Sequence, residues 1–318
     1  MKVERENLLL EALRSLETQM SEEMEIIVIK NYSSKIIEDY CFKYSITCIK
    51  SEKMLLGEKI AQGIQLSQGE VIAFLEDDDL FSECKISSIL QYFDNNPDLD
   101  YYHNSYTCID ENGQQINYLM VKQPLVDLWI DPTMKSVHKL VKLMRYTPYG
   151  GMSSTALRRR SILKSSYLLN EYNMMTDQVI FFLIMIGGGK AFFDKRLLTK
   201  YRIHRSGTHD FLNFKKYDYV KNRSIEEYFI SWEKLYKLCK GTPFENLAHS
   251  EYLFNKTRYE IYVKRRRQRS MVSAVLYLKS SLKLKNFKNG TFGFFYLSAE
   301  AIMGKKLTKI GYRLFKST

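Results

Sequence analysis

Four consecutive acidic residues follow a short apolar run and are the part of this sequence best suited to chemistry. The apolar run covers residues 71–75, and the acids are Glu76, Asp77, Asp78 and Asp79. The run predicts a buried strand in a largely parallel sheet with helices on both faces, and such sheets bind ligands beyond the carboxyl ends of their strands. Four carboxylates repel one another, so they need a positive partner, most simply a divalent cation. The alternative is a solvated acidic turn before a helix.

The flanking sequence predicts strands and helices in alternation. Helices are expected over residues 7–20, 57–67, 82–93 and 177–186, and strands over 25–29, 45–49, 71–75, 100–104, 153–157, 191–193 and 197–203. A hairpin turn is expected at 111–113, and a loop with a short helix over 124–150. Alternation at these lengths is typical of βαβ units, so the class is α/β.

Composition narrows the class of protein. The 318 residues contain no run of 18 apolar residues that could span a bilayer. The charged start of the chain predicts a helix rather than a signal peptide. Five scattered cysteines without CxxC spacing indicate a reducing compartment, with neither a disulfide framework nor a zinc site. We therefore expect a cytoplasmic protein.

Positive charge is concentrated in the last third of the chain. Residues 211–318 hold 23 Lys and Arg against 8 Asp and Glu, a net charge of +15, whereas the whole chain carries +12. Residues 1–210 therefore carry −3. This shift predicts two regions, a near-neutral α/β domain over 1–210 and a helical basic region over 211–318.

Three stretches, in order, resemble the GT-A glycosyltransferases, and family 2 in particular. The first is residues 9–16 with 25–28, and the second is residues 63–80, which contain the acidic run. The third runs from 150–154 through Thr176-Asp177 to Tyr201-Arg202-Ile203-His204. Together they cover roughly residues 7–210, and the second stretch is the most specific.

The resemblance implies a GT-A (Rossmann-like), mostly parallel sheet and a metal-dependent sugar transfer. A hexosyl group would pass from a nucleotide-diphosphate donor to a hydroxyl of a glycan or lipid-linked acceptor, with inversion. Asp78 or Asp79 would ligate the metal, and Glu76 or Asp77 would hold the ribose. Ligation by oxygen alone suits Mn²⁺ or Mg²⁺, which would stabilise the charge of the leaving diphosphate.

Two residues downstream complete the implied site. Asp177 stands where the family has its general base, which takes the proton of the acceptor hydroxyl. The alternative is an aspartate that only caps the helix that follows it. His204 stands where the family's closing segment approaches the metal or the diphosphate, although a lone histidine is often structural.

The nucleotide side departs from the family pattern. The family's first strand is missing or truncated in this sequence. Lys30 replaces the acid that accepts a hydrogen bond from the base, and a lysine ammonium can only donate. Asn31 beside it is the remaining candidate. Ile60-Ala61 replaces an Arg-Asn pair, which leaves Lys59 as the nearest cation. Asn31 and Lys59 are therefore the candidate donor-binding residues on this side.

The basic region predicts a membrane contact. Apolar residues recur at helical spacing between 302 and 314, with Lys and Arg between them. Such an amphipathic helix can bind the anionic inner face of the cell membrane, although its stripe could instead pack on the catalytic domain. Nucleic acid is not an expected partner, since no binding motif accompanies the charge.

Two other hypotheses for the function of the protein remain. One is an inactive GT-A-like protein that binds a glycan or a partner at the membrane surface. The other is a nucleotidyltransferase, which would need a Gly-rich, Lys/Arg-bearing loop after its first strand; the sequence shows no such loop.

Overall fold

The computed structural model describes residues 2–117, 127–143, 151–203, 214–284 and 287–303. The chain divides into two compact units. The first consists of Met1–Pro132 and Tyr146–His204, and the second of Thr133–Arg145 and Arg205–Thr318. Each unit has its own core and is described by itself.

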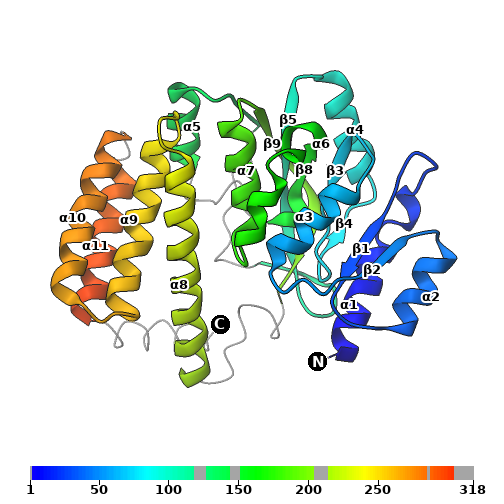
Figure 1. The fold of residues 1–318 in the computed structure, drawn as a ribbon, viewed down its shortest axis with the longest axis horizontal. Coiled ribbons are helices and arrows are strands. Elements are labelled where there is room, and N and C mark those ends of the chain that lie inside the picture. Colours follow the sequence, from blue (N-terminus) through cyan, green and yellow to red (C-terminus); the bar gives the residue numbers. More distant parts are fainter. Residues whose placement is uncertain (1, 118–126, 144–150, 204–213, 285–286, 304–318) are drawn as a thin grey trace. The chain divides into compact units, whose positions relative to one another are not determined.

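The first unit is α/β (Figure 1). Its strands are β1 (Ile27–Lys30), β2 (Thr47–Lys50), β3 (Val71–Ala73), β4 (Leu80–Phe81), β5 (Leu99–Ile109), β6 (Gln115–Ile116), β7 (Leu128–Ile130), β8 (Thr155–Arg158) and β9 (Lys190–Arg202). Its helices are α1 (Lys2–Arg14), α2 (Lys35–Lys43), α3 (Leu56–Leu66), α4 (Lys85–Asn95), α6 (Arg159–Leu163) and α7 (Thr176–Ile186).

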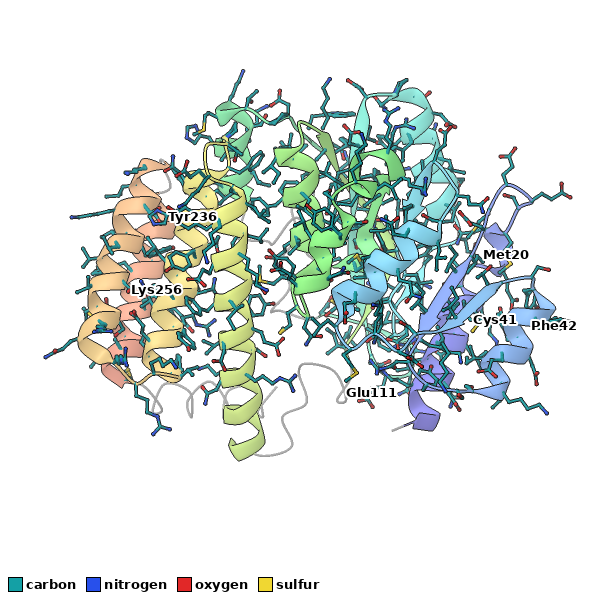
Figure 2. All side chains as sticks on the ribbon, viewed as in Figure 1. Met20, Cys41, Phe42, Glu111, Tyr236 and Lys256 are labelled. Carbon is teal, nitrogen blue, oxygen red and sulfur yellow. The ribbon has the colours of Figure 1, made fainter. Side chains whose placement is uncertain are left out.

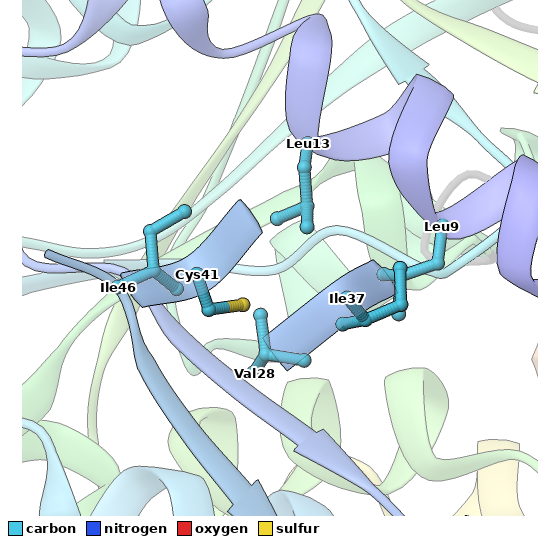
Figure 3. Close-up of a cluster of buried hydrophobic side chains, with 6 residues drawn as sticks. All are labelled: Leu9, Leu13, Val28, Ile37, Cys41 and Ile46. Atoms are coloured by element: carbon cyan, nitrogen blue, oxygen red, sulfur yellow. The ribbon is translucent and has the colours of Figure 1, made fainter. Parts of the chain in front are cut away.

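A small layer at the start of the unit is built on the parallel pair β1–β2. Figure 3 shows its core, in which α1, α2 and β1 contribute apolar side chains. These are Leu9, Leu13, Val28, Ile37, Cys41 and Ile46. The helical spacing of the leucines in α1 and the β-branched residues of β1 place these side chains on facing surfaces.

The main sheet has seven strands in the order β3-β8-β5-β9-β4, with β6 on β5 and β7 on β9. The predicted α/β class with a central sheet flanked by helices is confirmed. The pairing is more mixed than we expected, because β5 and β9 run parallel while β8 runs antiparallel to both β3 and β5. In the described residues β1 pairs with β2 alone and β3 with β8 alone. The Glu25 carboxylate nevertheless joins the starts of β1 and β3, since it accepts hydrogen bonds from the N–H groups of Gln68 and Gly69.

Helices α4 and α7 lie on opposite faces of the main sheet. Tyr101 and Tyr102 are successive residues of β5, so their side chains point to opposite faces. Tyr102 belongs to the core cluster that α4 builds with Ile89 and Phe93. Tyr101 instead contacts Phe181 of α7, with ring centroids 5.3 Å apart. The strands that carry the candidate site, β5, β8 and β9, therefore lie between these two helices.

The second unit is helical. It consists of α5 (Met134–Leu143), α8 (Phe214–Leu238), α9 (Glu245–Tyr262), α10 (Arg267–Lys283) and α11 (Phe287–Met303). Aromatic residues line the contact of α8 with α9, where the Phe229 and Tyr259 rings stack with centroids 4.5 Å apart. Tyr236 and Lys256, labelled in Figure 2, lie on these two helices. Within the described residues no helix has both the length and the apolar character needed to cross a membrane.

Candidate active site

The four acids lie in the segment between β3 and β4, the two outer strands of the order β3-β8-β5-β9-β4, so this segment crosses one end of the main sheet. The peptide N–H of Phe74 donates to the carbonyl of Thr155, which prolongs the contact with β8. The peptide N–H of Glu76 then donates to the hydroxyl of Ser153, at 2.9 Å. The segment before β8 therefore fixes the entry of the acidic turn, which lies beyond the carboxyl end of β3 as the sequence predicted.

Arg202, the last residue of β9, holds the other end of this turn. Its backbone N–H donates to Oδ1 of Asp79 at 2.9 Å, and its Nε donates to the carbonyl of Asp78 at 2.8 Å. Its remaining nitrogens donate to the carbonyls of Asp110 and Glu111 and to the carboxylate of Glu11. The side chain is fully buried, so one guanidinium joins α1, the acidic turn and the hairpin after β5.

Lys85, the first residue of α4, is a fully buried lysine near the turn. Its Nζ donates to the carbonyl of Ser153 and to the hydroxyl of Thr199, and it lies 3.9 Å from the ring centroid of Phe81. Burial holds the pKa of Lys85 well below its usual value, although the charge of Asp79 opposes that shift. The sequence reasoning missed this residue. A signal was present, since Lys85, Ile89 and Phe93 share the apolar face of α4.

Burial and mutual repulsion raise the pKa values of Glu76 and Asp79 in the turn. Burial raises the pKa of Asp79 to about 7, with Asp78 adding to the shift and the N–H of Arg202 opposing it. Burial also raises the pKa of Glu76 well above its usual value, and the charges of Asp79, Asp78, Asp177 and Asp77 contribute in that order. A cluster of this kind favours bound protons or a bound cation.

Asp177 lies close enough to Glu76 for its charge to contribute to the raised pKa of that residue. It lies in the first turn of α7, and its Oδ2 accepts a 2.6 Å hydrogen bond from the N–H of Gly151. Burial raises the pKa of Asp177, while hydrogen bonds from Gly151 and Gln178 oppose the shift. Met175, just before α7, has a left-handed backbone (φ 63°), which is strained for a residue other than glycine.

Two tyrosines lie close to these acids and were not predicted as site residues. Tyr106 of β5 and Tyr201 of β9 have ring centroids 5.2 Å apart. Burial raises the pKa of both phenols; Asp79 contributes to both shifts, and Asp177 adds to that of Tyr106. Both rings are partly exposed. They form an aromatic surface beside the carboxylates.

The end of β1 also approaches the acidic turn. Burial raises the pKa of Tyr32, and the next contribution comes from Asp77, which forms a 3.4 Å ion pair with Nε of Arg5. Asn31, the predicted donor-binding residue, lies exposed beside Tyr32. Its role stays a prediction.

Lys30 forms hydrogen bonds and an ion pair inside the protein. Its Nζ donates to Glu38 at 2.7 Å and to the carbonyl of Tyr32 at 2.8 Å, and its side chain is 3% exposed. Lys59 lies partly buried in α3, and its predicted donor contact stays a prediction. His204 lies outside the described residues, as do residues 304–314 of the predicted C-terminal helix.

The acidic turn fits a cation that is shared with a ligand. Oδ2 of Asp79 is buried and makes no hydrogen bond of standard geometry to any described residue. Among the same residues no group of three or more His, Cys, Asp or Glu could hold a metal by itself. Mg²⁺ is commonly bound by one or two carboxylates together with substrate phosphates, so the residues present match that kind of site rather than a closed protein cage.

The mixed α/β unit, with an acidic turn beyond β3 and an aspartate at the start of α7, defines a GT-A-type transferase fold. The comparison with protein families agrees with this class. The model described as glycosyl transferase family 2 matches residues 2–166. The chain belongs to this family.

Known relatives cover part of the chain. A glycosyltransferase of Haemophilus influenzae, described as uncharacterised, is 25% identical over 167 residues, which are 52% of this chain and 53% of the relative. One from Methanocaldococcus jannaschii is 26% identical over 160 residues, 45% of this chain and 55% of the relative. The chain therefore spans about half the length of the curated relatives it matches.

Solved structures share the fold. The crystal structure of Staphylococcus aureus TarS 1–349 matches with a TM-score of 0.59 and 12% identity, over 98% of this chain and 88% of that one. The same protein in complex with UDP-GlcNAc matches with a TM-score of 0.55, again at 12% identity, over 98% and 89% of the two chains.

Proposed function

We propose that this protein transfers a hexosyl group from a nucleotide-diphosphate donor to a hydroxyl of a glycan or lipid-linked acceptor. The observation that carries the proposal is that residues 151–153 hold both sites: the N–H of Gly151 donates to Asp177, and the hydroxyl of Ser153 accepts from the N–H of Glu76. Asp177 contributes to the raised pKa of Glu76, so a candidate base and a candidate diphosphate site lie together. Family membership and the TarS complex with UDP-GlcNAc support a nucleotide-sugar donor.

In this proposal Asp177 takes the proton from the acceptor hydroxyl while that oxygen attacks the anomeric carbon. A single displacement then inverts the anomeric configuration. The hydrogen bond from Gly151 orients one carboxylate oxygen, and burial keeps the carboxylate more basic than an exposed aspartate. Tyr106 and Tyr201 would supply an apolar surface for the face of a sugar ring.

Asp78 and Asp79 would hold Mn²⁺ or Mg²⁺ together with the donor diphosphate. The bound cation would neutralise the charge that grows on the leaving diphosphate. Arg202 supports both residues, because its N–H donates to Oδ1 of Asp79 and its Nε donates to the carbonyl of Asp78. Lys85 supports the neighbouring segment through the carbonyl of Ser153. Glu76 or Asp77 would hold the ribose, and Asn31 and Lys59 would complete the nucleotide side.

We extend the proposal to a cytoplasmic protein held peripherally at the inner face of the cell membrane. Its support is the basic C-terminal region, whose last 15 residues contain five Lys and Arg and no acid. Cations of this density attract anionic lipid surfaces. A lipid-linked acceptor would lie in that surface.

The test measures release of the nucleoside diphosphate from a panel of nucleotide sugars, with Mn²⁺ and with EDTA. We expect release from at least one donor with Mn²⁺ and its loss with EDTA. Exposed Asp98, which pairs with Lys190, supplies the matched control Asp98→Asn, which should retain full activity. Absence of release with every donor, from protein that folds and is monodisperse, contradicts the proposal.

One observation favours a second candidate, a GT-A-like protein that binds a glycan or a partner without turnover. Lys30 is used in an internal pair at the position where the family has a base-binding acid. This candidate predicts binding of a glycan with no donor release and no effect of Asp177→Asn on that binding.

A further inference from the structure

Helices α10 and α11 form a hairpin whose outward surface is apolar. Only three residues separate the helices, and they pack side by side (Figure 1). On α10 the exposed apolar residues are Met271, Val272, Val275, Leu276 and Leu282. On α11 they are Phe292, Phe295, Tyr296, Ile302 and Met303. We call these ten residues the hairpin face.

The inward side of α10 is packed through small residues at several positions. Its buried positions include Ser270, Ser273, Ser280 and Ser281, whereas several larger apolar residues point outward. The hydroxyls of Ser250 and Ser281 meet at 3.1 Å across the interface with α9. The buried side of α10 also holds Ala274 and Tyr277, so apolar residues lie on both its inner and its outer side. Large apolar residues left exposed together are typical of a surface that contacts an apolar partner.

Two glycines of α11 allow this helix to approach α10 closely. A Cβ on Gly290 would meet Ser281, and one on Gly293 would meet Tyr277. This close approach fixes the inner side of α11 and leaves Phe292 and Phe295 outside, where they are 74% and 70% exposed. The glycines of α11 therefore pack against side chains of α10, and this contact does not involve Phe292 or Phe295.

The exposed charged residues around the hairpin face are positive. From Lys264 to Met303 the sequence holds nine Lys and Arg and a single acid, Glu300. Glu300 is fully buried, accepts hydrogen bonds from the hydroxyls of Tyr262 and Tyr296, and pairs with Arg258. Lys279 and Lys283 lie exposed on α10 beside the apolar residues. The described part of this hairpin thus presents apolar and basic groups and no exposed carboxylate.

We infer that the hairpin face docks on an anionic lipid surface, with Phe292 and Phe295 in the acyl boundary and the lysines at the headgroups. Exposed apolar groups with lysines among them match that surface in both polarity and charge. A second copy of the chain is a poorer occupant, because a two-fold contact would bring the same cations together. The inference deepens the membrane part of the proposed function and rests on it, but it assigns the contact to described residues rather than to the segment after 303.

The test is flotation of the full chain with vesicles of phosphatidylcholine, alone or with phosphatidylglycerol. We expect binding to the anionic vesicles only, and at least about a tenfold weaker affinity for the double variant Phe292→Ser, Phe295→Ser. The matched control is Phe42→Ser. Phe42 lies on α2 in the first unit and is 89% exposed (Figure 2), so this variant removes a similarly exposed ring elsewhere.

A second, conservative variant tests the lipid contact without removing the aromatic side chain. Phe295→Trp keeps an aromatic side chain, and its emission, after subtraction of the signal from the two native tryptophans, should shift to the blue on anionic vesicles. Equal flotation of wild type and the double serine variant, or no blue shift in the Phe295→Trp variant, overturns the inference. Light scattering that shows a dimer dissociated by the serine variants, without lipid binding, assigns the face to a second copy instead. Donor release is assayed on the same samples, so absence of lipid binding with retained turnover refutes this inference alone.

Discussion

The carboxylate of Asp177 and the backbone N–H of Gly151 form a 2.6 Å hydrogen bond that joins the start of α7 to the segment before β8. Two residues further on, Ser153 accepts the hydrogen bond that fixes the entry of the acidic turn. One short segment therefore positions both the candidate base and the candidate diphosphate site.

Asp177→Asn should lower the rate of donor release or transfer by about 10²–10⁴-fold, the usual contribution of a general base. The amide oxygen can still accept the hydrogen bond of Gly151, so the affinity for UDP with Mn²⁺ should stay unchanged. Initial rates and calorimetry separate the two effects. Unchanged turnover would show that Asp177 only begins the helix.

The pH dependence of the rate follows from the burial of Asp177. Its pKa is raised, and it acts as a base only when ionised. The rate should therefore fall as pH drops through this raised pKa, at a higher pH than an exposed aspartate with a pKa near 3.9 would give. A pH–rate profile with saturating donor checks the position of the acid limb. A rate that stays constant down to about pH 4 contradicts the assignment.

Gly151→Ala should lower activity more than its effect on stability explains. Gly151 has φ 100°, where a Cβ costs about 1–2 kcal/mol, and relief of that strain would move the N–H away from Asp177. Gly188→Ala is the matched control, because Gly188 has φ 90°, open space around its Cβ position and a place at the far end of α7. Thermal unfolding and turnover of both variants give the comparison. An equal loss of activity in both would remove the specific role of Gly151.

Arg202→Lys should destabilise the fold by about 2–4 kcal/mol, because a lysine cannot reach the three carbonyls and the carboxylate that the guanidinium joins. Glu11→Gln is the milder companion. Glu11 is 46% exposed, so its replacement should cost less than about 1 kcal/mol. Urea unfolding measures both. Similar midpoints for Arg202→Lys and wild type would contradict the role of Arg202 in holding the turn.

Lys85→Met should change how stability depends on pH. The folded-state pKa of Lys85 lies well below 10.5, so between that lowered pKa and 10.5 the unfolded chain binds a proton that the folded chain does not. Wild type should therefore gain stability as pH rises through this window, by up to about 1.4 kcal/mol per unit, and Lys85→Met should lack this gain. Urea unfolding across neutral to alkaline pH measures it, with exposed Lys53→Met as the control. Parallel curves for Lys85→Met and wild type would contradict the prediction.

Periodicity predicted most of the architecture and only part of the site. The apolar runs at β1, β2 and β5 and the helical stripes of α3, α4 and α7 lie close to their predicted ranges, because short-range pattern controls which face is buried. The strand before the acids is shorter than predicted, since pairing with β8 stops at Ala73 in regular register. Strand directions could not be derived, because they depend on which distant segments pair.

The acidic turn was evident from sequence, whereas its internal partners were not. Arg202 lies 123 positions along the chain from Asp79, and local spacing does not link residues so far apart. Tyr106 and Tyr201 meet only because β5 and β9 run in parallel register. The cationic partner expected for the acids is therefore supplied in part by the protein itself. Oδ2 of Asp79, which makes no hydrogen bond of standard geometry within the described part of the chain, supports the metal prediction.

Calorimetric titration of UDP with Mn²⁺ into wild type, Asp79→Asn and Asp177→Asn tests the central claim most directly. In Asp79→Asn the amide oxygen can still accept from the N–H of Arg202, so the turn keeps its position while the charge is lost. We predict that wild type and Asp177→Asn bind alike, that Asp79→Asn binds at least about tenfold more weakly, and that EDTA removes the difference. Equal affinity of Asp79→Asn and wild type, or binding that EDTA leaves unchanged, would contradict a metal-assisted donor site at the acidic turn.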